Sequence, residues 1–177
     1  MGELERIEDQ LRRAVVGGAW HGPAVLELLA GVTPAQAAAY PVAGAHSIWE
    51  LVLHLSSDYG LILRRLGGDG RPLAESEGWP AVPEPTAENW TDTIRALERM
   101  NEDLRRAMTG FPAGRLDQPL VPGSPHTAYT QFIGVTQHNL YHAGQIALLK
   151  RALADAGQHA EPGAAADRQG GTAFPGS

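Results

Sequence analysis

The stretch Gln137-His138-Asn139-Leu140-Tyr141-His142-Ala143-Gly144-Gln145 decides how this chain is interpreted. His138 and His142 are four residues apart, a separation that stacks both side chains on one face of an α-helix. Two imidazoles placed in this way can bind one metal ion. The spacing alone is a weak motif, because such a pair also arises by accident or as hydrogen-bonded core histidines. Asn139 stands where the zinc proteases carry a general-base glutamate, so their HExxH motif is absent.

A third histidine strengthens the metal interpretation. His54 lies within the apolar run Leu51-Val52-Leu53-His54-Leu55 of an earlier helical segment. A lone histidine in such a run is more often a core residue, but here it could face the helix that carries His138 and His142. Three histidines leave a coordination position open, which is typical of catalytic rather than structural sites. Imidazole ligands favour zinc, nickel, copper or iron over magnesium or calcium.

Supporting groups are proposed from their spacing to these histidines. Asp58, one turn beyond His54, is a candidate base or extra ligand, or else a solvated carboxylate. Gln145, three residues after His142, is a candidate hydrogen-bond partner for substrate or for a ligand imidazole. Tyr141 could supply a hydroxyl or simply pack between helices. Asp58, Tyr141 and Gln145 are therefore the candidate catalytic groups.

The remaining histidines have weaker interpretations. His46 is expected in the capping region of the helix that begins after Ser47, and His21 lies in a break of the first helical segment. We expect no chemistry from His126, in a predicted loop, or from His159, in the predicted tail.

Four segments have helical periodicity, at residues 3–30, 47–66, 87–108 and 128–153. Gly17-Gly18 and Gly22-Pro23 break the first into a kinked helix or two helices, with Pro23 in a first turn. Ser47 and Glu50 form a capping box, Gly67-Gly68 ends that helix, and Thr86 is the expected cap of the third.

The fold class that follows is all-α, with the four segments arranged as a four-helix bundle. Residues 1–154 form the one domain. The four prolines between positions 69 and 85 predict a long non-helical connection that covers part of the fold. Residues 155–177 are rich in Gly, Ala and Pro and are predicted to be a disordered tail.

Composition excludes several classes of function. The chain has 177 residues, a net charge of -6 and no cysteine. An acidic chain lacks the basic face that nucleic acids or anionic membranes require, so neither is an expected partner. The absence of cysteine excludes disulfides, thiolate ligands and a cysteine nucleophile. With no signal peptide and no apolar span, the chain is predicted to be cytoplasmic.

Several motifs together resemble the DinB superfamily, including its YfiT-like metal-dependent hydrolases. They are residues 20–23 (WHGP), residues 46–50 (HSIWE) followed by His54, and residues 137–146. The resemblance covers about residues 5–152 and implies a four-helix bundle with up-down-down-up connectivity, often a homodimer. It also implies a metal triad of His54, His138 and His142, with zinc or nickel as the usual metal, ahead of iron or manganese.

The resemblance also implies a range of reactions. Relatives include transferases that use a low-molecular-weight thiol and a thiol-dependent maleylpyruvate isomerase. A metal-dependent thiol transferase or isomerase acting on a small electrophile is therefore the first hypothesis, with the thiol as co-substrate. The alternatives are a metal-dependent hydrolase of a small amide or ester, and a non-catalytic metal-binding or stress-response module. Substrate, metal identity and oligomeric state are left open by the sequence.

Overall fold

The computed structural model describes residues 1–159 of the chain, and every regular element in that range is helical. The elements are α1 (Glu3–Val15), α2 (Val25–Leu29), α3 (Pro34–Ala38), α4 (Ile48–Leu66), α5 (Glu75–Gly78), α6 (Ala87–Thr109), η1 (Ala113–Arg115) and α7 (Ala128–His159). Within this range the β-structure amounts to one isolated bridge between Pro119 and Thr127. The predicted all-α class is confirmed.

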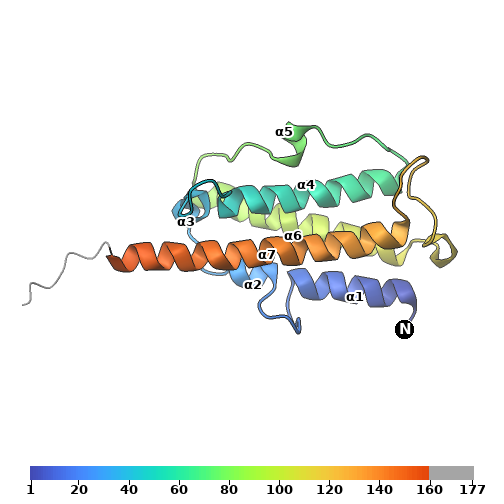
Figure 1. Ribbon diagram of the computed structural model, residues 1–177, viewed down its shortest axis with the longest axis horizontal. Helices are drawn as coiled ribbons and strands as arrows, with labels where there is room; N and C mark the ends of the chain where they lie inside the picture. The colour runs from blue at the N-terminus through green and yellow to red at the C-terminus, as the bar shows by residue number, and fades with distance from the viewer. Residues whose placement is uncertain (160–177) are drawn as a thin grey trace, which may run out of the picture.

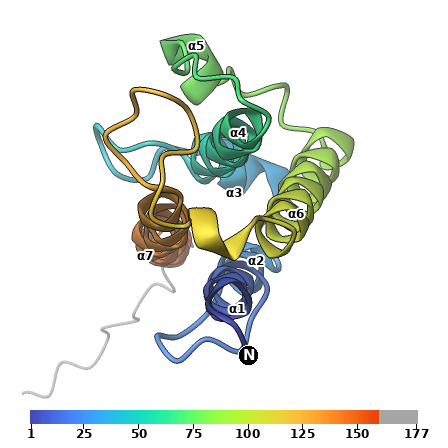
Figure 2. The ribbon, with the colours of Figure 1, turned by 90° about the vertical axis from the view of Figure 1, so that its right-hand side faces the viewer.

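The long helices α1, α4, α6 and α7 lie side by side around a common apolar core (Figure 1). Seen along their axes in Figure 2, α6 and α7 lie on opposite sides, between α1 and α4. Helix contacts agree, since α1 and α4 each pack against both α6 and α7. The core is built from fully buried side chains of all four helices: Leu11, Val15, Leu51, Leu55, Leu97, Leu104, Phe132 and Ile146.

Local capping explains where α4 and α6 begin. Ser47 Oγ accepts a hydrogen bond from the Glu50 amide at 3.2 Å, and Glu50 Oε2 accepts one from the Ser47 amide at 2.7 Å. This is the predicted capping box, which satisfies two amides that the first helical turn leaves unpaired. Thr86 Oγ1 caps α6 by accepting a hydrogen bond from the Asn89 amide at 3.1 Å. Helix α4 ends at Leu66 with Gly67 as its C-cap, and Gly68 follows with a φ of +89°.

The first predicted segment is two helices, α1 and α2, separated by a turn in which Gly17, Gly18 and Gly22 have positive φ. Pro23 is not in the first turn of α2 as predicted, because Ala24 is the N-cap and Pro23 precedes it. The sequence also missed α3, which opens with Pro34 after a Thr33 cap.

Two further boundaries differ from prediction. The connection between α4 and α6 contains the short helix α5, which lies between Pro72 and Pro80. Helix α7 continues past Leu153 to His159, so residues 155–159 of the predicted tail are helical. The rest of that tail, residues 160–177, lies outside the described residues. Among residues 1–159, no helix combines the length and apolar character needed to cross a membrane.

Candidate metal centre

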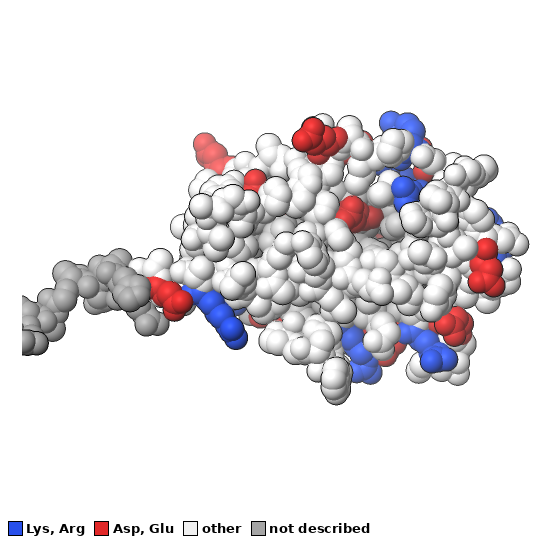
Figure 3. Space-filling view, in the orientation of Figure 1, with Lys and Arg blue, Asp and Glu red and all other residues white. Residues whose placement is uncertain are grey.

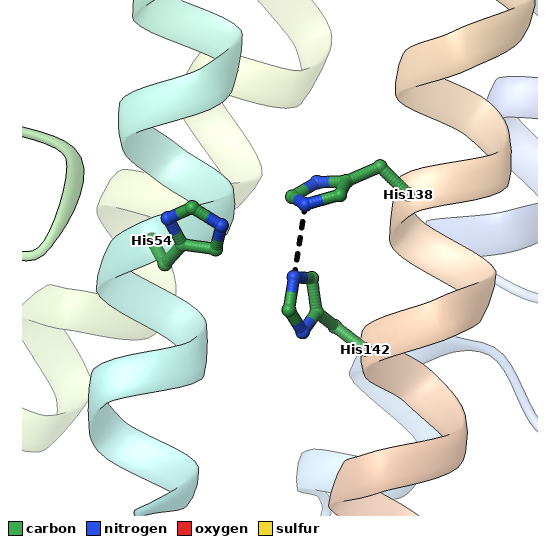
Figure 4. A group of neighbouring side chains, drawn as sticks. All are labelled: His54, His138 and His142. Carbon is green, nitrogen blue, oxygen red and sulfur yellow. Dashed lines mark hydrogen bonds between the residues drawn. The ribbon is translucent and has the colours of Figure 1, made fainter. Parts of the chain in front are cut away.

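The three predicted ligand histidines converge in the space between α4 and α7 (Figure 4). His54 comes from the middle of α4, and His138 and His142 come from successive turns of α7. One ring nitrogen from each residue lies within 4.8 Å of the other two. The closest pair is His138 Nε2 and His142 Nε2, which are 2.9 Å apart. The spacing of the α7 pair and the α4–α7 packing therefore bring the rings to a common point.

Each imidazole turns its other nitrogen, Nδ1, toward an oxygen. His54 Nδ1 donates to the Gly78 carbonyl at 2.8 Å, and His142 Nδ1 donates to Gln145 Oε1 at 2.6 Å. His138 Nδ1 lies 2.9 Å from Asp58 Oδ2, with its N–H off the line of a good hydrogen bond. Because a ring proton held at Nδ1 leaves Nε2 as a lone pair, the Gly78 carbonyl and Gln145 prepare the Nε2 atoms of His54 and His142 as ligands.

These residues fit a divalent metal ion. Ligands about 2.0–2.1 Å from one ion are at most about 4.2 Å apart, and both the 2.9 Å pair and the approach of the third ring to within 4.8 Å are close to that spacing. Without a metal, one of these two Nε2 atoms donates a hydrogen bond to the other (Figure 4), and a bound cation would take the place of that proton. Three neutral imidazoles suit zinc or nickel better than magnesium or calcium.

Burial and the neighbouring histidines keep the imidazole of His142, the most buried of the three, in its neutral form. His142 is 4% exposed, and burial is the main cause that lowers its pKa, to about 4. The neighbouring His138 and His54 lower it further, against the opposing effects of Gln145 and Asp58. A neutral imidazole is the ligand form of histidine, so the His142 ring is available to a metal through the whole neutral range.

The predicted supporting groups differ in how closely they approach the triad. Asp58 Oδ2 contacts two ligands, at 2.9 Å from His138 Nδ1 and 3.6 Å from His54 Nε2. Gln145 touches His142 as described above, which agrees with its proposed contact to a ligand imidazole. The Tyr141 ring lies edge-on to His142, 5.1 Å between centroids, but its side chain is 65% exposed and does not pack between helices.

A cavity of about 310 Å³ opens beside the triad, between α4 and the start of α7. Asp58 and His138 line it next to the metal-binding rings, and Leu61, Ile62 and Val135 supply apolar walls. His126, for which the sequence predicted no chemistry, also lines this cavity together with Thr130 and Gln131. His21 lines different cavities, with Leu140 of α7, and is not part of the triad.

Sequence reasoning missed two neighbours of the site. Gly78 and Trp79, at the end of α5, contact His54 through the carbonyl described above and through a ring stack at 3.9 Å. Neither residue has a fixed sequence spacing to His54 that could have identified it. A tryptophan in a proline-rich connection was the one available signal.

Comparison with known proteins identifies the family. The sequence profile of the DinB superfamily matches residues 19–146, which is more than half of the chain and includes all three ligand histidines. Searches of curated proteins and of solved structures returned no match. The resemblance carried by residues 20–23, 46–54 and 137–146 is thus confirmed, and the chain belongs to the DinB superfamily.

Proposed function

We propose that this protein is a metal-dependent enzyme that joins a low-molecular-weight thiol to a small electrophile, or isomerises such a substrate. The observation that carries the metal site is the shared arrangement of three histidines, each with Nδ1 facing an oxygen and Nε2 facing the other rings. We further infer that α1, α4, α6 and α7 form the up-down-down-up bundle implied by the family resemblance. That bundle holds the two ligand-bearing helices side by side.

The chain's own residues have defined parts in this proposal. His54, His138 and His142 hold the ion, which when bound supplies a Lewis acid that stabilises a thiolate or polarises a carbonyl. Because the chain has no cysteine, the sulfur must come from a co-substrate. Leu61, Ile62 and Val135 give the neighbouring cavity an apolar wall that suits a small organic electrophile.

Asp58 is the group placed to move a proton. Its carboxylate lines the cavity and touches the ligand His138, so it can accept the thiol proton close to the ion. With a chloro-aromatic substrate, a C–S bond forms, the C–Cl bond breaks and chloride leaves. The released proton passes to Asp58 and then to solvent.

Hydrolysis of a small amide or ester is the second candidate, and the same carboxylate beside the cavity favours it. Asp58 would then accept a proton from water instead of from a thiol. The third candidate is a metal-binding module without turnover. Because an open three-histidine site suits all three functions, activity assays are needed to separate them.

The test incubates zinc- or nickel-loaded protein, purified without a histidine tag, with a bacterial thiol and a chloro-aromatic electrophile. Adduct formation that is lost in His142→Ala and kept in the control His21→Ala supports thiol transfer. Thiol-independent ester cleavage with the same sensitivity supports hydrolysis instead. Metal binding without either reaction would contradict the enzyme proposal and leave the binding module.

A homodimer and a cytoplasmic location, where low-molecular-weight thiols are abundant, are part of this proposal. Figure 3 shows the face crossed by α7, where charged groups lie mainly around the edge. Tyr141 and Leu148 of α7 are 65% and 62% exposed. Exposed apolar side chains on a sparsely charged helix support pairing of two copies.

A net charge of -6 supports the expectation of a small-molecule partner rather than nucleic acid or membrane.

A further inference from the structure

The connection between α4 and α6 covers the outer side of the metal centre. We call residues 69–85, which include α5, the strap. In Figure 1 the strap runs along α4 on the side away from α1, and α5 contacts α4. Glu77 of the strap is 3.4 Å from Arg64 of α4, an ion pair that ties the two together. The strap thereby brings Gly78 and Trp79 next to His54.

Trp79 is the middle ring of a three-ring stack. Its centroid is 3.9 Å from that of His54 with 4° between the planes, and 3.7 Å from that of His46 with 11° between the planes. Two imidazoles cannot share one face of the indole at these distances without clashing, so they lie on opposite faces. His46, the outer ring, is itself next to Glu50 Oε2 at 3.5 Å. The stack fixes the plane of the His54 ring.

The Gly78 carbonyl fixes the rotation and the tautomer of the His54 ring, which the stack alone does not determine. It is 2.8 Å from His54 Nδ1, and because a carbonyl only accepts, the ring proton is held at Nδ1. Gly78 is buried, so this hydrogen bond is shielded from competing water. A parallel stack restricts tilting, and the hydrogen bond selects the tautomer and the rotation about the ring's attachment. Together they direct His54 Nε2 toward His138 and His142.

We propose that Gly78 and Trp79 are positioning residues for His54, which make the strap the outer wall of the metal centre. The inference rests on the proposed metal site but has its own observable, the orientation of one imidazole. His138 and His142 are adjacent on one helix and are oriented by Asp58 and Gln145. His54 is the ligand on the other helix, so its orientation decides whether the triad closes around one ion.

The test compares the full-length chain with Trp79→Leu and Trp79→Phe. Leucine keeps apolar volume but has no ring face, whereas phenylalanine keeps the stack. Trp20→Leu is the matched control, because Trp20 is fully exposed in the α1–α2 turn. Zn²⁺ affinity is measured by competition with a chromophoric chelator, and Co²⁺ reports coordination through its visible spectrum. We expect Trp79→Leu to bind about 10–100-fold more weakly, with an altered Co²⁺ spectrum, and Trp79→Phe and Trp20→Leu to stay within about threefold of the original chain.

A second readout does not depend on metal. NMR of the metal-free protein detects the His54 Nδ1 proton, which the Gly78 hydrogen bond should protect from exchange in the original chain and in Trp79→Phe, but not in Trp79→Leu. If the original chain binds no metal, the metal proposal fails while this proton still decides the positioning role. Equal Zn²⁺ affinity and equal proton protection in Trp79→Leu and the original chain would overturn the inference.

Discussion

At the scale of single residues, the centre depends on how each imidazole is held by its neighbours. Asp58, Gln145 and the Gly78 carbonyl each face one Nδ1 atom, and they come from three different elements. Such contacts fix ring orientation and raise the basicity of the metal-binding nitrogen. The rings are therefore oriented by the protein itself, and individual substitutions should have separable effects on metal affinity and on stability.

His142→Ala should abolish metal binding at the centre. The substitution removes the most buried ligand and leaves two imidazoles on different helices, so we expect Zn²⁺ affinity to fall by more than about 100-fold. Metal content after gel filtration and competition titration measure the loss. His21→Ala, which removes a histidine outside the triad, should keep full occupancy. Full metal content in His142→Ala would contradict the assignment of this ligand.

The metal-free protein should lose stability in acid because of His142. The His142 pKa is about 4 in the folded chain and about 6.5 in the unfolded chain, so the unfolded chain takes up the proton first. The stabilisation is complete above pH 6.5 and is lost progressively as pH falls toward 4, with a magnitude of about 3 kcal/mol. Urea unfolding across this range should show a shallower pH dependence for His142→Gln. An identical slope in both proteins would contradict the low pKa.

At the scale of elements, a buried polar contact sets how α4 and α7 face each other. Tyr59 of α4 donates to Asn139 Oδ1 of α7 at 2.7 Å, and both side chains are fully buried. Burial raises the pKa of Tyr59, which keeps the hydroxyl protonated as the donor. Asn139 follows the ligand His138 directly, so this contact helps fix the rotation of α7 that directs the histidines toward α4.

Tyr59→Phe should therefore destabilise the fold. It removes the donor and leaves the Asn139 carbonyl oxygen buried without its partner, which costs about 1–3 kcal/mol. Chemical denaturation measures the change in the free energy of unfolding. Tyr129→Phe is the control, because Tyr129 is 42% exposed and should change stability by less than about 0.5 kcal/mol. Equal stability of the two variants would show that the buried contact does not hold the helices.

The predictable elements were those specified by local chemistry. Ser47, Glu50 and Gly68 marked the ends of α4 because capping and positive φ act within a few residues. The four-residue spacing of His138 and His142 likewise indicated a shared face before any tertiary structure was considered. Helix α7 is longer than predicted because a helix can continue through residues such as Ala and Asp without burying an apolar face.

The unpredicted parts depend on how distant segments meet. His54 was proposed as the third ligand from its place in an apolar helical segment, and the family resemblance implied the same residue, but no sequence spacing showed that it faces His138 and His142. The strap was expected to be non-helical because of its prolines, yet α5 fits between two of them and carries Gly78 to His54. The stack of Trp79 with His46 and His54 depends on the tertiary path of the strap and has no sequence period.

At the scale of the whole molecule, the proposed metal centre is a cross-link between two helices. Its ligands join α4 to α7, and neither helix carries all three. An ion that binds only when both helices are in place binds the folded chain and not the unfolded one. Metal binding at this site would therefore stabilise the whole bundle against unfolding.

Zn²⁺ should accordingly raise the melting temperature. At about 100 times its dissociation constant, a ligand specific to the folded state adds about 2.7 kcal/mol, which for a chain of this length corresponds to about 5–10 °C. Scanning calorimetry with and without a chelator measures the shift. The double variant His138→Ala/His142→Ala is the control and should show none. A shift of equal size in that variant would locate the bound metal elsewhere.

The most direct test of the account is X-ray absorption spectroscopy at the metal edge, on protein loaded with one equivalent of Zn²⁺ or Ni²⁺. We predict one ion per chain with three imidazole nitrogens at about 2.0–2.1 Å, and a loss of imidazole scattering in His54→Ala. A bound ion surrounded by oxygen alone, or an imidazole count unaffected by His54→Ala, would contradict the claim that α4 and α7 together hold the metal.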